Sequence, residues 1–591
     1  MDDRSIGFLL LLIIATLFFR YNFDNDSVKS KKDFIEKVTN KSSQETNIVE
    51  NTQIDHYDNI FNDLNDSKNG NKDNKNDDCV YIKNGYITVG FSKNNATIQS
   101  VKLNKYENYN NGNVDLIDNT FIDNIHIVLD DGDVYDSYKS TNVNLKTKRD
   151  QSIVFQDTYD CKNGDKLIVE SSFELDDAQH GYELKRDIKI SGYTGSIKNI
   201  ELQIYDNIKR QETNAEDCKR KVVIKYLDKD SNVGSCYMNS EYTSCKSSLQ
   251  WLNIMQKFFS VGISQNAIDC ELKNVKIKLC NYDGDNKQEY LHTAKVIFNP
   301  FCNKTELAEI NGHLKYYFGP NIAHYMSFFS YNFDKSIYFG IPVIRVFNKY
   351  IIDTTIKTFH HLMGINGILV IILLLILFFI FYIPLLIRSL RSKKKIELLQ
   401  PTIQYISEKN SKNTNERNFQ IQEIYKNAKV EYKYMFLAQI VHGLFFMSML
   451  TIIPQEISFR RVQFLWCNDL SNYDSIFDFS FNIPLYGNHV SLFTLISLFL
   501  LFLISFIKSK ISPQNDNKKE NNVIKILLQC FIILCFNNTC AALQLFYLLF
   551  IYSVNIFEYI INNTICKTTT IEKEIMHNVS NFKKNPSSWM M

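Results

Sequence analysis

Residues 367–387 read GILVIILLLILFFIFYIPLLI, a continuous run without a charged side chain. As an α-helix with a rise of roughly 1.5 Å per residue, this run would be about 31 Å long, which matches a hydrocarbon core of ~30 Å. Upstream, residues 341–362 place apolar and charged side chains on different faces of a helix, as in helices that lie on a membrane surface. We therefore expect an amphipathic interfacial helix at 341–362, followed by a membrane span at 363–387.

Other apolar segments predict five more spans. Residues 1–23 contain the uncharged run Ile6–Phe19, and no small-residue cleavage site follows it, so we interpret them as a retained N-terminal membrane anchor. Spans 3–6 are predicted within residues 435–561. Their apolar stretches are Met435–Ile453, Val490–Ile507 and the two halves of Val523–Ile561, which is interrupted at Asn537. The sequence therefore predicts six spans.

Lysine and arginine in the loops set the expected orientation, because short positive loops stay in the cytoplasm. Residues 388–434 carry eleven Lys and Arg, whereas residues 454–489 carry only Arg460 and Arg461. The region 508–522 and the tail at 562–591 are again rich in lysine. We therefore expect both termini and the 388–434 segment in the cytoplasm.

Residues 79–340 show a different pattern, in which short alternating runs are separated by turn-forming pairs. Tyr81–Val89 is a hairpin signal, because Asn84-Gly85 can supply the positive φ angles of a tight turn. Similar runs recur at Lys166–Leu175, Tyr182–Ile190, Ile197–Tyr205, Lys221–Tyr226 and Asn274–Leu279. Many short strands predict a large antiparallel β-sandwich, which the expected orientation places outside the membrane. The Asn-, Asp-, Lys- and Ser-rich residues 24–78 predict a disordered polar linker.

Charge and motifs exclude several classes of function. The net charge is +2, from 66 Lys and Arg against 64 Asp and Glu, so specific nucleic-acid binding is not expected. The motifs H-E-x-x-H, G-x-x-x-x-G-K-[ST], G-x-S-x-G and G-x-G-x-x-G are absent, and we expect no catalytic residue, no enzyme activity and no cofactor. No metal site is expected either, since His360 and His361 point in different directions on a helix.

Eight of the 13 cysteines fall in the predicted exterior domain. They are Cys79, Cys161, Cys218, Cys236, Cys245, Cys270, Cys280 and Cys302. An even number in an oxidising compartment permits up to four disulfides, while reduced thiols packed as small apolar side chains are an equally open alternative.

Several short motifs occur along the chain, and their order is more specific than any one of them alone. Leu399–Gln404 reads Leu-Gln-Pro-Thr-Ile-Gln, Ile424–Val430 reads Ile-Tyr-Lys-Asn-Ala-Lys-Val, and Trp466–Ser471 reads Trp-Cys-Asn-Asp-Leu-Ser. Ile511–Pro513 and Leu543–Tyr547 follow in the last third of the chain, and Trp251–Phe259 and Tyr317–Pro320 lie in the exterior domain. Together these segments resemble the YidC/Oxa family of membrane protein insertases, in the Gram-negative YidC branch.

This resemblance implies a multi-pass α-helical protein of the bacterial inner membrane, with a periplasmic β-sandwich and a cytoplasmic helical hairpin at 388–434. It implies an insertase that works without nucleotide hydrolysis. Nascent membrane proteins would enter a polar groove and leave into lipid, independently of the Sec translocon or together with it. Ribosomes and membrane lipid are further implied partners, because the family's hairpin contacts the translation machinery.

The sequence departs from the family at the groove. The family's groove arginine is replaced by Phe379, so the chain resembles a divergent member. Intramembrane polar residues are then the candidate groove residues, with interhelical hydrogen bonding as the alternative for each. These candidates are Gln439, His442, Gln529, Asn538 and Gln544. The candidate hairpin contacts are Lys393, Lys394, Lys395, Lys426 and Lys429, for which the alternative is a solvated face attracted to anionic lipid.

Two other functions remain open from the sequence. A degenerate scaffold would bind translocon partners and insert nothing. A transporter with an external domain would show inverted repeats or broken helices at the membrane midplane, and the sequence displays neither.

Overall fold

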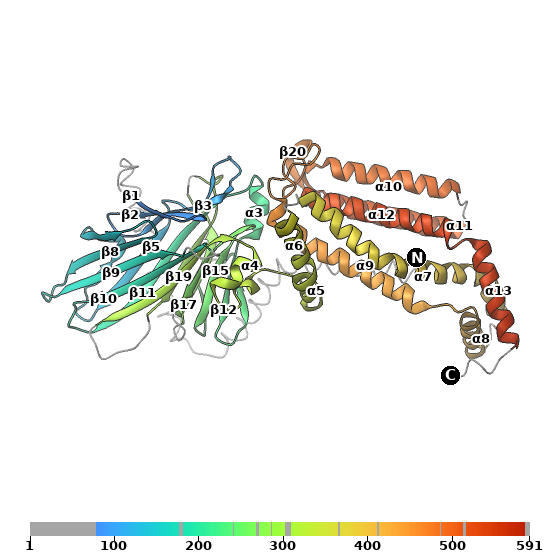
Figure 1. Ribbon diagram of the computed structural model, residues 1–591, viewed down its shortest axis with the longest axis horizontal. Helices are drawn as coiled ribbons and strands as arrows, with labels where there is room; N and C mark the ends of the chain where they lie inside the picture. Colours follow the sequence, from blue (N-terminus) through green and yellow to red (C-terminus); the bar gives the residue numbers. More distant parts are fainter. Residues whose placement is uncertain are drawn as a thin grey trace. The chain divides into compact units, whose positions relative to one another are not determined.

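The computed structural model describes residues 79–176, 181–239, 241–266, 271–284, 286–301, 309–363, 367–410, 413–484, 486–511 and 516–584. These residues form two compact units that divide after Ile337. We call them the β unit (79–337) and the helical unit (338–584) (Figure 1). The predicted anchor at 1–23 and linker at 24–78 lie outside the described residues.

The described part of the β unit forms three antiparallel sheets. Their strand orders are β13-β12-β15-β16-β19-β10-β9-β8-β7, β14-β17-β18-β11-β5-β6 and β1-β2-β3-β4. The strands are β1 (Cys79–Lys83), β2 (Ile87–Ser92), β3 (Ile98–Glu107), β4 (Asn113–Ile117), β5 (Ile122–Leu129), β6 (Val134–Asp136), β7 (Val143–Lys148), β8 (Ser152–Asp160), β9 (Lys166–Leu175), β10 (Glu183–Ser191), β11 (Ile197–Lys209), β12 (Val223–Asp228), β13 (Val233–Cys236), β14 (Thr243–Ser244), β15 (Leu249–Met255), β16 (Phe259–Gln265), β17 (Lys273–Asn281), β18 (Tyr290–Asn299) and β19 (Ile310–Pro320). Short helices lie between the strands at η1 (Ser137–Lys139) and α3 (Ala215–Lys221), and after the last strand at α4 (Ala323–Phe329) and η2 (Phe333–Ser336).

The two larger sheets are joined by a buried ion pair, between Arg186 of β10 and Asp123 of β5. Inward positions alternate along the strands, so that Leu167, Val169, Phe173 and Leu175 of β9 are buried. Each predicted strand-like run contains a strand, and β9 coincides with its predicted range. The starts of two runs differ, because Tyr182 precedes β10, and Lys221 and Val222 belong to the end and C-cap of the helix α3.

The hairpin between β1 and β2 forms, but not through the predicted turn. Neither Asn84 nor Gly85 is among the residues with a positive φ angle. Instead, the side-chain Oδ1 of Asn84 accepts hydrogen bonds from the backbone N–H groups of Tyr86 and Ile87, both at 2.8 Å. The side chain of Asn84 therefore replaces the backbone geometry that an Asn-Gly turn would have supplied.

The helical unit contains long helices that run side by side (Figure 1). They are α5 (Pro342–Phe347), η3 (Asn348–Ile352), α6 (Asp353–Met363), α7 (Gly367–Lys409), α8 (Thr414–Asn427), α9 (Tyr432–Ile452), η4 (Ile453–Gln455), η5 (Ile457–Phe459), α10 (Leu492–Ile511), α11 (Asp516–Phe536), α12 (Ala541–Thr564) and α13 (Thr568–Lys584). A small hairpin of β20 (Phe477–Ile483) and β21 (Gly487–Val490) lies in the segment between α9 and α10.

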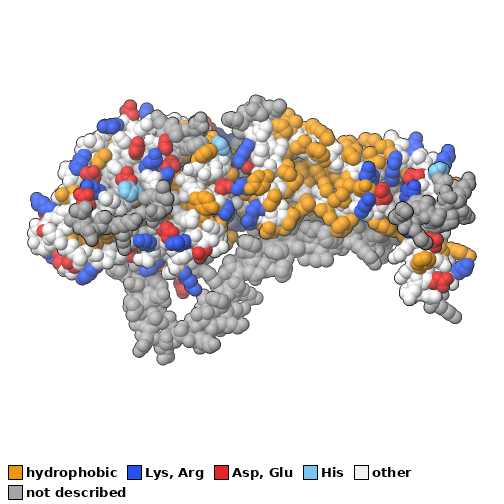
Figure 2. Space-filling model, turned by 60° about the horizontal axis from the view of Figure 1, so that its bottom comes forward, with side chains coloured by type: hydrophobic (Ala, Val, Ile, Leu, Met, Phe, Trp, Pro, Cys, Tyr) orange, Lys and Arg blue, Asp and Glu red, His pale blue; other side chains and the backbone are white. Residues whose placement is uncertain are grey.

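Three described helices are long and apolar enough to cross a membrane, namely α7, α9 with its 3-10 extension, and α12. Two shorter apolar stretches lie in α10 and α11, at Leu492–Ile507 and Ile526–Phe536. Figure 2 shows hydrophobic side chains over the flanks of these helices, with Lys and Arg gathered toward the end that carries α8 and α13. The exposed apolar side chains include Ile372, Ile376, Ile380, Phe381, Phe499, Phe502, Phe506 and Ile556.

The helix α7 differs from its prediction, because it does not end near residue 387. It continues through Pro384 and Pro401 to Lys409, so the predicted span and the first hairpin helix are one rod. Packing favours this continuity, since Leu390, Ser392 and Lys395 of the extension are buried and α7 contacts both α9 and α13. These contacts offset the backbone hydrogen bonds that the two prolines remove.

The predicted amphipathic helix at 341–362 is present as α5, η3 and α6 in succession. The central turn is a π-helix, and it rotates the following side chains relative to a regular α-helix. In this segment Ile352 and Ile356 are buried, while Ile351 is exposed.

Candidate functional site

The helices α7, α9 and α12 enclose an interior of stacked aromatic rings. The ring of Phe378 on α7 lies 4.2 Å from that of Phe445 on α9 and 5.5 Å from that of Phe550 on α12, between centroids. Phe446 on α9 stacks on Phe550 with nearly parallel planes. Aromatic pairs of this kind each contribute about 0.5–1.5 kcal/mol beyond their burial. The middle of this bundle is therefore filled by rings.

His442 is part of this aromatic interior. Its imidazole ring lies 4.8 Å from the ring of Phe550 and 6.1 Å from that of Tyr382, and the residue is half-buried. Gln439, one turn earlier on α9, is exposed. The two groove residues predicted on α9 thus lie close along the helix but in different surroundings.

A pocket of about 430 Å³ lies on the seam between α7 and α12. It is lined by Ile372, Leu375, Ile376, Phe379, Ile380, Ile383, Leu549, Ser553 and Phe557. Phe379, which occupies the expected arginine position, forms part of the wall with its ring 4.8 Å from that of Phe557. Ser553 is the one lining residue with a polar side chain, and the five predicted groove residues lie elsewhere.

Polar side chains gather at one end of the bundle, where α7 leads toward α8; we call it the hairpin end. Arg388 donates a hydrogen bond of 2.5 Å to the hydroxyl of Tyr434, and its guanidinium lies 4.7 Å from the centre of that ring. On α12, the half-buried carboxylate of Glu558 interacts electrostatically with the hydroxyl of the buried Tyr382. The sequence analysis missed both residues of this last pair, although a lone carboxylate in an apolar run was the available signal.

A buried hydrogen-bond network closes the opposite end, which we call the loop end (residues 453–491 and 537–540). Gln544 Nε2 donates to the carbonyls of Asn537 and Thr539, both at 3.1 Å. The hydroxyl of Ser491 donates a bifurcated hydrogen bond to Gln544 Oε1 and to Asp474. Asn537 Oδ1 in turn accepts from the backbone N–H of Ser491 at 3.0 Å. Gln544 therefore joins α12 to the residue before α10 and to the turn after α11.

The Trp466–Ser471 segment belongs to the same end. Trp466 Nε1 donates to Asp474 at 2.9 Å, while Asp469 accepts from both the N–H and the hydroxyl of Ser471 at 2.9 and 2.8 Å. The carbonyl of Leu470 accepts from the N–H of Ala542 at 2.9 Å, which satisfies one of the open donors at the start of α12. The segment that carries the family resemblance thus fastens a loop to the helix ends.

The remaining predicted groove residues do not complete a single site. Gln529 is half-buried on α11, and Asn538 is half-buried in the turn that follows it. The structure therefore places His442 among rings, Gln544 inside the network at the loop end, and Gln439 on the surface.

The predicted hairpin lysines also differ from one another. Lys395 is buried, donates to the carbonyl of Lys429 at 3.2 Å and forms an ion pair of 2.8 Å with Glu574 on α13. Lys394 pairs with Glu397 at 3.0 Å. Lys393, Lys426 and Lys429 are exposed. The predicted lysines therefore divide into a buried one, Lys395, and three that are exposed on the surface.

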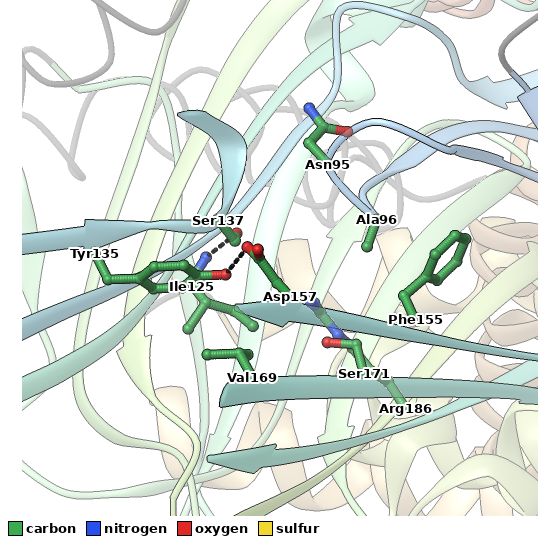
Figure 3. A pocket seen from close by; sticks show the side chains of 10 residues that line it. All are labelled: Asn95, Ala96, Ile125, Tyr135, Ser137, Phe155, Asp157, Val169, Ser171 and Arg186. Carbon is green, nitrogen blue, oxygen red and sulfur yellow. Dashed lines mark hydrogen bonds between the residues drawn. The ribbon is translucent and has the colours of Figure 1, made fainter. Parts of the chain in front are cut away.

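A small polar cavity lies inside the β unit (Figure 3). The hydroxyl of Tyr135 donates to Asp157 at 2.5 Å, and burial, followed by the Asp157 charge, raises the pKa of that phenol well above its usual range. Arg186 reaches the cavity wall, and its Nε has no partner within the described residues. The space for a bound group is about 10 Å³, enough for roughly one water molecule, so this cavity is too small for a larger substrate.

Within the described residues no group of three His, Cys, Asp or Glu side chains is arranged to hold a metal ion. Cys79, Cys161, Cys218 and Cys245 are thiols without a disulfide. Burial is the main cause that raises the pKa of Cys218 and of Cys245 to about 12, so these thiols are unreactive near neutral pH. The predicted positions Cys270 and Cys302 lie outside the described residues.

Comparison with known families gives a match for each unit. The family model described as "YidC periplasmic domain" matches residues 80–353, and the one described as "60Kd inner membrane protein" matches residues 358–569. The chain belongs to the YidC/Oxa family of membrane protein insertases. It is an inner-membrane protein, and its β unit corresponds to the periplasmic domain of YidC.

Individual relatives carry the same name. The membrane protein insertase YidC of Prosthecochloris aestuarii is 25% identical over 493 residues, covering 79% of this chain and 80% of the relative. That of Amoebophilus asiaticus is 23% identical over 574 residues, covering 93% and 90%. A crystal structure of an active YidC insertase with its first transmembrane domain resolved is 13% identical, with a TM-score of 0.30, and covers 82% of this chain and 92% of that chain. The two family models and the curated relatives confirm the resemblance predicted from sequence, and these relatives are named as insertases.

Proposed function

We propose that this protein inserts nascent membrane proteins into the inner membrane and releases them into lipid without hydrolysing nucleotide. The observation that carries the proposal is the match of both units to YidC, together with a pocket that is embedded in the apolar part of the helical unit. The pocket offers apolar walls, and the hairpin end offers polar side chains. An amphipathic segment needs both kinds of surroundings during insertion.

The proposed mechanism follows from the cost of transferring polar groups into lipid. A charged side chain at the centre of a bilayer costs at least several kcal/mol, whereas an apolar helix gains free energy on entering it. A client that reaches the pocket from the hairpin end can keep its polar groups beside Arg388, Tyr434 and Glu558 while its apolar face contacts α7 and α12. Partitioning of the apolar segment into lipid then supplies the driving force.

The rest of the architecture belongs to the same proposal. We propose six spans, formed by the N-terminal segment with α7, α9, α10, α11 and α12, with both termini and the α7–α8 hairpin in the cytoplasm. The Lys- and Arg-rich sequence at 388–434 supports this orientation. The exposed Lys393, Lys426 and Lys429 are the candidate contacts for ribosomes or anionic lipid, and the Sec translocon is a candidate partner.

Reconstitution tests the proposed function. The full-length protein in liposomes should insert a small inner-membrane client at a yield well above that of empty vesicles. Equal yields with and without the protein would instead favour the scaffold alternative. A photoreactive residue at His442 should crosslink to a ribosome-stalled client, because His442 lies beside the pocket-forming helices; absence of such a crosslink would remove α9 from the client path.

A further inference from the structure

A single carboxylate lies where the pocket between α7 and α12 approaches the hairpin end. Glu558 directly follows Phe557, the last residue of α12 that lines the pocket, and it is the only charged residue between Ala541 and Thr564. The residue is half-buried, and no ion pair to it is formed within the described residues. An unpaired carboxylate in partly apolar surroundings is costly, so a cationic partner would lower its free energy.

The shape of the pocket indicates what that partner is attached to. The lining residues of α7 extend from Ile372 to Ile383, about 16 Å along the helix or roughly three turns. Apart from Ser553 the walls are apolar or aromatic. A surface of this length and composition fits the apolar face of a helix, as facing helices pack side chains into each other's grooves.

Transmembrane helices carry Lys and Arg at their cytoplasmic ends, so a helix seated in the pocket would bring a cation to the level of Glu558. We propose that the pocket receives the cytoplasmic end of a client's transmembrane helix, and that Glu558 pairs with the Lys or Arg that flanks it. This inference rests on the proposed insertase function and deepens it. A lipid acyl chain could fill the apolar walls, but an anionic headgroup would be repelled by the carboxylate.

The test uses the full-length protein in liposomes and three clients that differ only at the cytoplasmic flank of one helix, which carries Lys-Lys, Gln-Gln or Glu-Glu. The measured quantity is the yield of the Lys-flanked client divided by that of the Glu-flanked client. This ratio should be about fivefold higher for the wild-type protein than for Glu558→Gln, which lacks the carboxylate. Glu558→Lys should reverse the preference. Each variant is scored by the ratio between its clients, so a lower overall yield does not obscure the result.

Two controls separate the possible outcomes. Glu572→Gln on α13 makes the same charge change at an exposed residue and should leave the ratio at its wild-type value. A photoreactive residue at Ser553 should crosslink to the Lys-flanked client. An unchanged ratio in both Glu558 variants, or crosslinks from Ser553 to lipid alone, would overturn the inference. Failure of the wild-type protein to insert any client would instead overturn the proposed function itself.

Discussion

Arg186 on β10 and Asp123 on β5 form an ion pair of 2.6 Å that joins the two large sheets of the β unit. Both side chains are buried, with 2% and 0% of their surface exposed. Arg186 Nη1 also donates to the hydroxyl of Tyr316 at 3.3 Å. Asp123 Oδ1 and Arg186 Nε have no partner within the described residues, so the desolvation cost of the pair is offset mainly by its own attraction and by the hydrogen bond to Tyr316.

We expect Arg186→Met to destabilise the β unit by about 3–5 kcal/mol, because it leaves the Asp123 carboxylate buried without a counter-ion. The double variant Arg186→Met with Asp123→Leu should recover most of that loss. Urea titration of the full-length protein in detergent, read by pulse proteolysis of the β unit, measures both. A double variant no more stable than the single one would show that the pair itself is needed.

The stability of the β unit should depend on pH through Asp206. Burial, with a smaller contribution from the nearby Asp118 carboxylate, raises the pKa of Asp206 from 3.8 to about 8. The folded state therefore retains a proton that the unfolded chain releases, and stability falls as the pH rises from about 4 to about 8. Asp206→Asn mimics the protonated form and should flatten this part of the urea-midpoint profile. The exposed Asp150→Asn should leave the slope unchanged.

Gln544→Leu should lower the thermal stability of the helical unit. The variant removes the donors to the carbonyls of Asn537 and Thr539, and each buried group left unpaired costs about 1–3 kcal/mol. The melting temperature in detergent measures the effect, and Gln529→Leu on the neighbouring α11 is the control with the smaller expected shift. If Gln544→Leu melts normally but inserts clients poorly, Gln544 contacts clients directly and the groove prediction for it is favoured.

The ion pair between Lys395 and Glu574 should hold α13 against α7. Glu574→Gln removes the counter-ion of a buried ammonium, and because Glu574 is 40% exposed we expect a loss of only about 1 kcal/mol. Limited proteolysis within α13 should then become roughly fivefold faster. Lys573→Gln, at an exposed neighbouring position, serves as the control. Equal cleavage rates in the two variants would mean that α13 is held by its apolar contacts alone.

Periodicity and turn residues predicted part of the elements of both units. The alternation in Lys166–Leu175 gave β9 with its observed bounds, and the interruption at Asn537 separates α11 from α12. The predicted span ended at Ile387, where the uncharged run stops before Arg388, whereas α7 continues to Lys409 because packing along its extension keeps the helix intact through Pro384 and Pro401. An Asn-Gly pair likewise predicted the right hairpin for the wrong reason, since the Asn84 side chain forms the turn.

Contacts between distant residues account for what the sequence did not reveal. Arg186 lies between Leu184 and Ile188 on the inward face of β10. A charged residue at such a position was the signal in the sequence that could have indicated a buried ion pair. Its partner lies 63 residues away and could not be chosen by pattern. Gln544 was selected as a polar residue within an apolar run, and its hydrogen bonds to Ser491 and Asn537 could not be predicted because they depend on how α12 meets the segments beside α10 and α11.

The unbroken course of α7 has a mechanical implication. At roughly 1.5 Å per residue, its 43 residues form a continuous helix of about 64 Å, about twice the thickness of the hydrocarbon layer. Phe379 and Lys395 lie on this one helix, so a displacement of α8 or α13 would also tilt the pocket wall that contains Phe379. Binding of a large assembly at the Lys-rich end of α7 would thus move the wall of the pocket between α7 and α12. Two glycines inserted after Ser392 would interrupt the helix and uncouple the two ends.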